Sequence, residues 1–107
     1  MSRRIILSPD ARAQLDAAAR WYSRKEINLP RRFRAEVQST LLGIARYPYA
    51  YVRIDAAVRR ACMNRFRYYI YFRFNAERVL VTGIIHQRRA DTVWKDRIDN
   101  FGGRSDD

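Results

Sequence analysis

The amino-acid sequence predicts an α+β domain in which a helical hairpin packs on one face of a small sheet with mainly antiparallel strands. Two observations predict this fold class. Apolar residues recur at helical spacing in the first half of the chain, and they alternate with polar residues in the second half. The chain has 107 residues, of which 48 % are hydrophobic, enough for one modest core. We therefore expect one domain over residues 1–100 and a disordered tail over 101–107.

The first half predicts one strand and two helices. Residues 3–7 read Arg-Arg-Ile-Ile-Leu, which is typical of a short strand. A Ser-Pro pair suits the start of a helix over 9–23, because serine caps the free amides and proline fits the first turn. The segment Asn28-Leu29-Pro30 predicts the start of a second helix over 29–46, and Pro48 ends it. The short link between the helices predicts an antiparallel hairpin.

The second half predicts three strands, over 58–63, 66–74 and 77–85, after a loop over 49–57 that could hold a strand start. In 66–74 aromatic and apolar residues alternate with arginine and tyrosine, so one face should be buried and the other open. Segment 77–85 is apolar at both odd and even positions, which is typical of an inner strand covered on both faces. A short helix over 92–100 completes the order β-α-α-β-β-β(-α).

The composition indicates a negatively charged partner. Lysine and arginine number 22 against 11 acids, which gives a net charge of +11, and nearly all of the basic residues are arginine. The single cysteine, Cys62, excludes an internal disulfide and a cysteine-based zinc site, and it fits a reducing cytoplasm. No apolar run reaches membrane-spanning length and no secretory leader is evident, so we expect a cytoplasmic protein without membrane contact. No cofactor or metal is expected.

Arg67, Tyr69, Tyr71 and Arg73 form the most informative local pattern, because they alternate charge with stacking surface along one face of a strand. Such a row can hold a phosphate backbone and stack unpaired bases. It is equally consistent with a solvated face on which arginine stems cover aromatic rings. Both interpretations stay open at this point.

Further arginines gather on the last three strands and their ends; together with Arg67 they are Arg59, Arg60, Arg65, Arg88 and Arg89. Such a cluster can stabilise the charge that builds up when a 2′-hydroxyl attacks its own phosphate, or it can hold an acidic peptide or solubilise the domain. His86, the only histidine, is either a general acid or base or a structural residue. Trp94 either caps the core or offers a stacking ring. No triad, paired carboxylates or Gly-rich phosphate loop supports an ordinary hydrolase.

The order of these motifs resembles the RelE/ParE toxin superfamily over residues 5–97. The similarity consists of the Ser-Pro start of the first helix, the helical hairpin, Arg59-Arg60 at the start of a strand, the run Arg67-Tyr-Tyr-Ile-Tyr-Phe-Arg in the next strand and Ile-Ile-His86-Gln-Arg-Arg in the last. The resemblance implies a growth-inhibiting toxin of a type II toxin–antitoxin module, neutralised by an acidic, partly disordered antitoxin that covers apolar ground along the hairpin and at a sheet edge.

The superfamily has two main activities, and the resemblance favours the second. RelE-like members cut mRNA in the ribosome without a metal, and ParE-like members poison DNA gyrase without chemistry of their own. By motif position Arg60, Arg67 and Arg88 match basic catalytic residues, with His86 as acid or base. However, Trp94 replaces a tyrosine and Val58 replaces a lysine that RelE-like nucleases often carry. The His-x-Arg-Arg ending is similar to ParE-like sequences. Expected target contacts are Arg59, Arg65, Tyr69, Tyr71, Arg73, Arg89 and Trp94.

Overall fold

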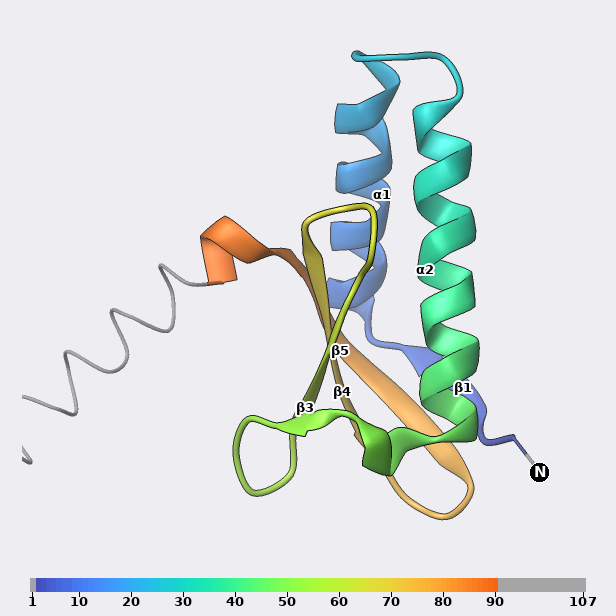
Figure 1. Cartoon of the computed structure of the whole chain (residues 1–107), viewed down its shortest axis with the longest axis vertical. Helices are drawn as coiled ribbons and strands as arrows, with labels where there is room; N and C mark the ends of the chain where they lie inside the picture. The colour runs from blue at the N-terminus through green and yellow to red at the C-terminus, as the bar shows by residue number, and fades with distance from the viewer. Residues whose placement is uncertain (1, 91–107) are drawn as a thin grey trace, which may run out of the picture.

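The structure, a computed structural model, describes residues 2–90 and contains one five-stranded sheet with two helices packed against it (Figure 1). Its elements are β1 (Arg4–Leu7), α1 (Pro9–Ser23), α2 (Leu29–Arg46), the short 3-10 helix η1 (Pro48–Ala50), β2 (Val52–Arg53), β3 (Arg59–Cys62), β4 (Tyr68–Phe74) and β5 (Arg78–His86). The strand order is β1-β5-β4-β3-β2. Only β1 pairs in parallel, with β5, and the other pairs are antiparallel. The predicted α+β class is confirmed.

Both helices begin where the sequence predicts. The Ser8 hydroxyl accepts a hydrogen bond from the Ala11 amide at 3.0 Å, and Pro9 occupies the first turn of α1. The face of α1 that meets the rest of the protein carries small buried residues, Ala11, Ala18 and Ala19, so α2 and the sheet can approach closely. An exposed ion pair between Arg34 and Asp16, 3.1 Å long, joins the helices and contributes about 1 kcal/mol at most.

The core lies between the helical hairpin and one face of the sheet. Phe33 and Ile44 of α2 meet Ile70 and Phe72 of β4 and Val79 of β5, and all five are fully buried. Toward the tip of the hairpin the core is aromatic: the Phe33 ring centroid lies 5.2 Å from those of Tyr22 and Phe66 and 5.1 Å from that of Tyr68. This aromatic part of the core supports the end of the sheet where β5 finishes.

The region expected to be a loop over 49–57 has more structure than predicted. It contains η1 and the two residues of β2, which pair with β3 through Val52–Arg60 and Arg53–Arg59. The possible strand start in this loop is therefore real. The helix predicted over 92–100, Trp94 and the tail over 101–107 lie outside the described residues. Among residues 2–90, no helix is both long enough and apolar enough to span a bilayer.

A β-bulge in β5 corrects one prediction. Tyr71 pairs with Gly83 and Phe72 with Val81, so Thr82 is an extra residue without a partner on β4. The bulge changes the parity of the strand, because Val79 and Val81 face the core before it and Ile84 after it. This explains why 77–85 is apolar at both parities. The strand is an inner one, as predicted, but the expectation that both its faces are covered is wrong, since Leu80 is 38 % exposed.

Candidate functional site

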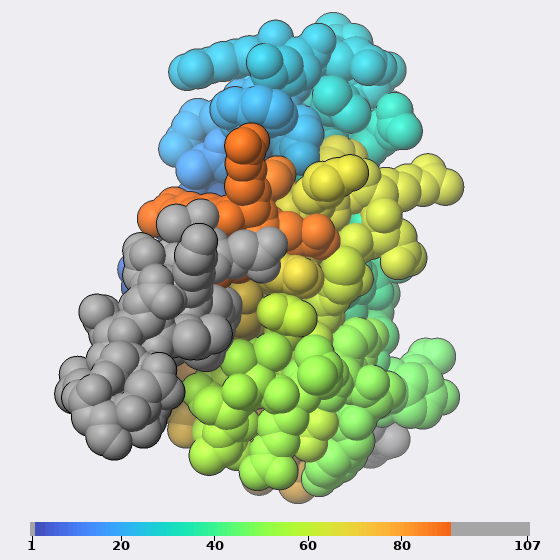
Figure 2. Space-filling view, turned by 60° about the vertical axis from the view of Figure 1, so that its left-hand side comes forward, coloured from blue at the N-terminus to red at the C-terminus, as the bar shows by residue number. Residues whose placement is uncertain are grey.

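The face of the sheet opposite the helices carries part of the predicted basic and aromatic row. Tyr69, Tyr71 and Arg73 alternate on β4 with the core residues, and Arg60 of β3 pairs with Tyr71. The Arg60 guanidinium lies 4.1 Å from the centroid of the Tyr69 ring, and the Tyr69 and Tyr71 rings are 6.1 Å apart. In the space-filling view, β2, β3 and the turn that follows (green to yellow) run along one side of the molecule (Figure 2).

Two members of the predicted row do not lie as expected. Tyr71 is only 8 % exposed, so the expectation that it offers an open stacking ring is wrong, and its buried hydroxyl has no hydrogen-bond partner among the described residues. Arg67 is exposed but precedes β4, and its carbonyl accepts a hydrogen bond from the Gln87 amide at 2.7 Å. Arg67 therefore lies at the end of the sheet, in the turn between β3 and β4.

The neighbours Arg59 and Arg60 point to opposite faces of the sheet. Arg59 pairs with Phe72, on the core side, and its Nη1 donates to the Tyr51 carbonyl at 2.8 Å. It is therefore separated from the row that holds Arg60. Arg65 is exposed in the turn before β4, where its amide donates to the Glu36 carboxylate at 2.9 Å.

His86 faces the helices because of the bulge in β5. It pairs with Tyr68, and the two rings lie 5.1 Å apart and nearly perpendicular. Its Nδ1 accepts a hydrogen bond from the Arg88 amide at 3.1 Å, so only Nε2 is left for another partner. Of the four catalytic candidates, Arg67, His86 and Arg88 gather at one end of the sheet, whereas Arg60 lies on the opposite face from the His86 ring.

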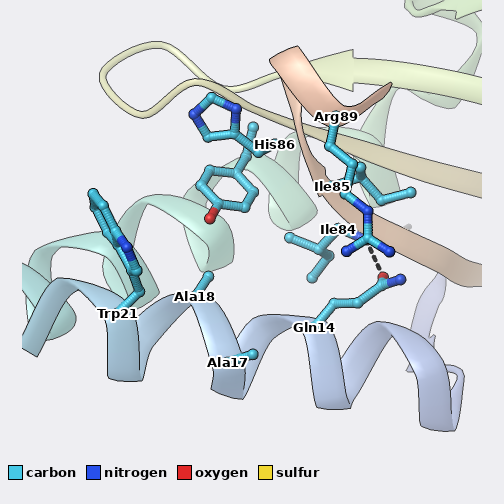
Figure 3. A pocket seen from close by; sticks show the side chains of 9 residues that line it. Gln14, Ala17, Ala18, Trp21, Ile84, Ile85, His86 and Arg89 are labelled. Atoms are coloured by element: carbon cyan, nitrogen blue, oxygen red, sulfur yellow. Dashed lines mark hydrogen bonds between the residues drawn. The ribbon is translucent and has the colours of Figure 1, made fainter. Parts of the chain in front are cut away.

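A groove, which we call the α1–β5 groove, separates α1 from the last residues of β5 (Figure 3). Its volume is about 370 Å³, and it is lined by Gln14, Ala17, Ala18, Trp21, Tyr68, Ile84, Ile85, His86 and Arg89. Figure 3 shows Gln14 and Trp21 projecting from α1, with His86 and Arg89 across from them. Trp21 is 52 % exposed, and the Lys25 ammonium lies 4.7 Å from the centroid of the Trp21 ring.

The groove exists because β1 is shorter than β5. The pairing of β1 with β5 ends at Leu7 and Val81, so within residues 2–90 no strand lies beside the rest of β5 on that edge. At one position the Gln14 side chain replaces the missing backbone partner, since its Oε1 accepts a hydrogen bond from the Ile84 amide at 2.8 Å. Sequence reasoning missed Gln14 and Trp21. The available signal in the sequence was a single amide side chain, Gln14, next to the small-residue stripe of α1.

Burial raises the pKa of the Tyr68 hydroxyl above the ordinary tyrosine value of 10.0. The pKa of Tyr22 is raised as well, first by burial and then by the nearby Tyr68. Both phenols therefore stay protonated near neutral pH and do not act as bases there. Within residues 2–90, no group of three or more His, Cys, Asp or Glu side chains is arranged to hold a metal ion.

The comparisons with known proteins agree with this architecture. The family model described as "ParE toxin of type II toxin-antitoxin system, parDE" matches residues 5–91. A solved structure, the chromosomal ParDE toxin–antitoxin system from P. aeruginosa, is similar in fold with a TM-score of 0.64 at 14 % identity, covering 79 % of this chain and 96 % of that one. No curated protein matches the chain in sequence. The family match bears out the predicted superfamily and its ParE-like side, so this chain belongs to the ParE toxin family of type II toxin–antitoxin systems.

Proposed function

We propose that this toxin inhibits DNA gyrase by binding to it and that it cleaves no bond itself. The observation that supports this most is the bulge in β5, which turns the His86 ring toward the helices and away from the face that carries Arg60. General acid–base cleavage of RNA needs a proton-transfer group and the phosphate-holding cations around one reacting atom. The alternative, a ribosome-dependent mRNA endonuclease, has its candidate residues divided between two faces.

The charge of the protein fits a target that carries nucleic acid. A net charge of +11 steers association with a polyanion, and the effect is strongest at low salt. Both gyrase bound to DNA and the ribosome present such a surface, so charge does not separate the two targets. We place the encounter in the cytoplasm, where the exposed thiol of Cys62 stays reduced.

Controlled expression in a bacterial host tests the proposed target. We expect an SOS response and gyrase-linked DNA breaks, with mRNA intact at the time growth stops. Arg67→Ala and Arg88→Ala should leave the mRNA pattern unchanged, because no cleavage depends on them. Early loss of translation with cut mRNA, abolished by these two substitutions, would instead establish the endonuclease. Soluble protein without any growth defect would exclude both activities.

We further propose that the cognate antitoxin occupies the α1–β5 groove. The groove is mainly apolar and lies beside the free edge of β5, so it suits an amphipathic segment that adds backbone hydrogen bonds to apolar contact. Trp21 offers a large exposed ring, and Arg89 at the rim suits an acidic side chain. An antitoxin bound here would cover His86 and neighbouring residues at the end of β5.

Ala17→Glu is expected to weaken antitoxin binding by at least tenfold, because it places a negative charge and extra volume in the groove opposite an acidic partner. Ala13→Glu is the matched control, since Ala13 is also exposed on α1 but does not line the groove. Titration calorimetry with the product of the adjacent antitoxin gene measures both. Equal affinity of the two variants would place the antitoxin elsewhere.

A further inference from the structure

A second basic site lies at the other end of the sheet from the α1–β5 groove. Four arginines, Arg3, Arg53, Arg59 and Arg73, line a cavity of about 430 Å³ together with Tyr49 and Phe74. We call this set the basal arginine cluster. It comes together where the chain enters β1, where β2 turns into β3 and where β4 turns into β5, at the bottom of Figure 1. Neither His86 nor any other groove residue belongs to it.

Three of these arginines are held in place by backbone carbonyls. Arg3 Nε donates to the Asn75 carbonyl at 2.7 Å, Arg59 Nη1 to that of Tyr51 at 2.8 Å, and Arg53 Nη2 to that of Ala56 at 3.1 Å. Each of these bonds uses one of five guanidinium N–H groups. The cations are therefore fixed while most of their donors remain available to a ligand.

The two aromatic rings fix Arg3 and Arg59 further. The Arg3 guanidinium lies 6.0 Å from the Tyr49 centroid and 5.4 Å from that of Phe74, and Arg59 lies 5.6 and 5.7 Å from the same two centroids. The rings themselves meet edge to face at 4.9 Å. Two guanidinium groups are thus gathered around one aromatic pair, although like charges repel.

No ion pair between residues 2–90 involves the basal arginine cluster. The one ion pair of that part of the chain joins Arg34 and Asp16, on the helices. The nearest acid in sequence, Asp55, uses its Oδ1 to accept the amides of Ala57 and Val58, both at 3.1 Å, and so holds the turn between β2 and β3. Three of these four arginines are fixed, and no ion pair within residues 2–90 offsets their charge, so an anion that joins them is electrostatically favoured.

We propose that the basal arginine cluster binds the phosphodiester backbone of DNA. Guanidinium forks match phosphate oxygens in pairs, and cations supplied by three separate segments suit successive phosphates along a strand. Tyr49 is 72 % exposed next to them and offers a surface for a sugar or a base. The inference goes beyond the proposed function, because it concerns contact with DNA when no protein target is present.

Fluorescence anisotropy with a short labelled oligonucleotide, single-stranded and duplex, tests the proposal without gyrase. The double variant Arg53→Ala/Arg73→Ala is expected to bind about tenfold more weakly and to lower the slope of log affinity against log salt by about 1–2. Arg12→Ala/Arg20→Ala removes the same charge from exposed positions of α1 and should change affinity less than about twofold. A labelled polyglutamate measured in parallel identifies a site for acidic polypeptide.

Equal losses in the two double variants would overturn the proposal, since the binding would then follow net charge. It is likewise overturned if neither oligonucleotide binds, or if the basal arginine cluster variant loses polyglutamate but not DNA. Circular dichroism checks the fold. If the double variant unfolds, the single variant Arg73→Gln takes its place in the DNA-binding measurement. This variant should keep the fold, because Arg73 is exposed and makes no side-chain hydrogen bond or ion pair within residues 2–90. Since gyrase is absent from this assay, its outcome is independent of the proposed target.

Discussion

Phe33→Ala is expected to lower the free energy of unfolding by about 3–5 kcal/mol. Phe33 is fully buried, and its ring is the meeting point of Tyr22 from α1, Phe66 from the turn before β4 and Tyr68 from β4, with centroids 5.1–5.2 Å apart. Removing it leaves a cavity where both helices and the sheet meet, and a close-packed core relaxes only partly into such a space. The aromatic part of the core that supports Tyr68 and His86 would lose its centre.

Urea unfolding followed by circular dichroism measures this change. Phe33→Leu is the control, because it keeps most of the apolar volume and should cost clearly less than the alanine variant. A loss of under about 1 kcal/mol for Phe33→Ala would contradict this packing of the aromatic rings.

Thermal unfolding at rising pH tests the two buried tyrosines. The raised pKa values of Tyr22 and Tyr68 predict full stability below pH 10 and a loss of stability as the pH rises further.

Deleting Leu80 is expected to cost about 2–4 kcal/mol, whereas deleting Thr82 should cost less than about 1.5 kcal/mol. Thr82 is the extra residue of the bulge, so its removal leaves Val81 and Gly83 in their present registers with β4. The loss is limited to one hydrogen bond, from the Thr82 hydroxyl to the Tyr71 carbonyl at 3.3 Å. Deletion of Leu80 cannot leave all the neighbouring residues in their present registers with β4.

Without Leu80, either available register exposes a buried valine. If the bulge stays, Val79 turns to the open face. If the bulge is absorbed, Val81 turns outward and the Thr82 hydroxyl enters the core. Both valines are now fully buried. The two deletions measured side by side by urea unfolding test the parity change directly. Equal costs would mean that Thr82 is not the unpaired residue and that the direction of His86 has another origin.

The sequence predicted the elements whose signals are local. The predicted start of α1 at Ser8 and Pro9 is confirmed, because the residues that cap a helix lie within one turn of each other. The predicted helix α2 is confirmed as well, because the apolar residues from Phe33 to Ile44 recur at helical spacing and form a single buried face. The alternation along β4 likewise identified Ile70 and Phe72 as core residues. The helical hairpin and the mainly antiparallel sheet followed from these elements and from short connections.

The candidate site was harder to predict, because it depends on pairing between distant segments. Nothing within 77–85 reveals that Thr82 has no partner, yet this bulge decides the direction of His86. Arg59 and Arg60 look like one basic pair in sequence, but strand alternation separates them onto two faces. The basal arginine cluster joins Arg3 to Arg59 and Arg73 through strand order, which no local pattern contains.

We expect this ParE-family toxin to act by binding its target and not by cutting RNA. The most direct measurement incubates the purified protein with gyrase and supercoiled plasmid, and in parallel with programmed ribosomes, and counts cleaved DNA and cleaved mRNA. We predict protein-linked DNA breaks that require gyrase, together with intact mRNA. Ribosome-dependent mRNA cuts without gyrase-linked breaks, lost in Arg67→Ala, would contradict the account.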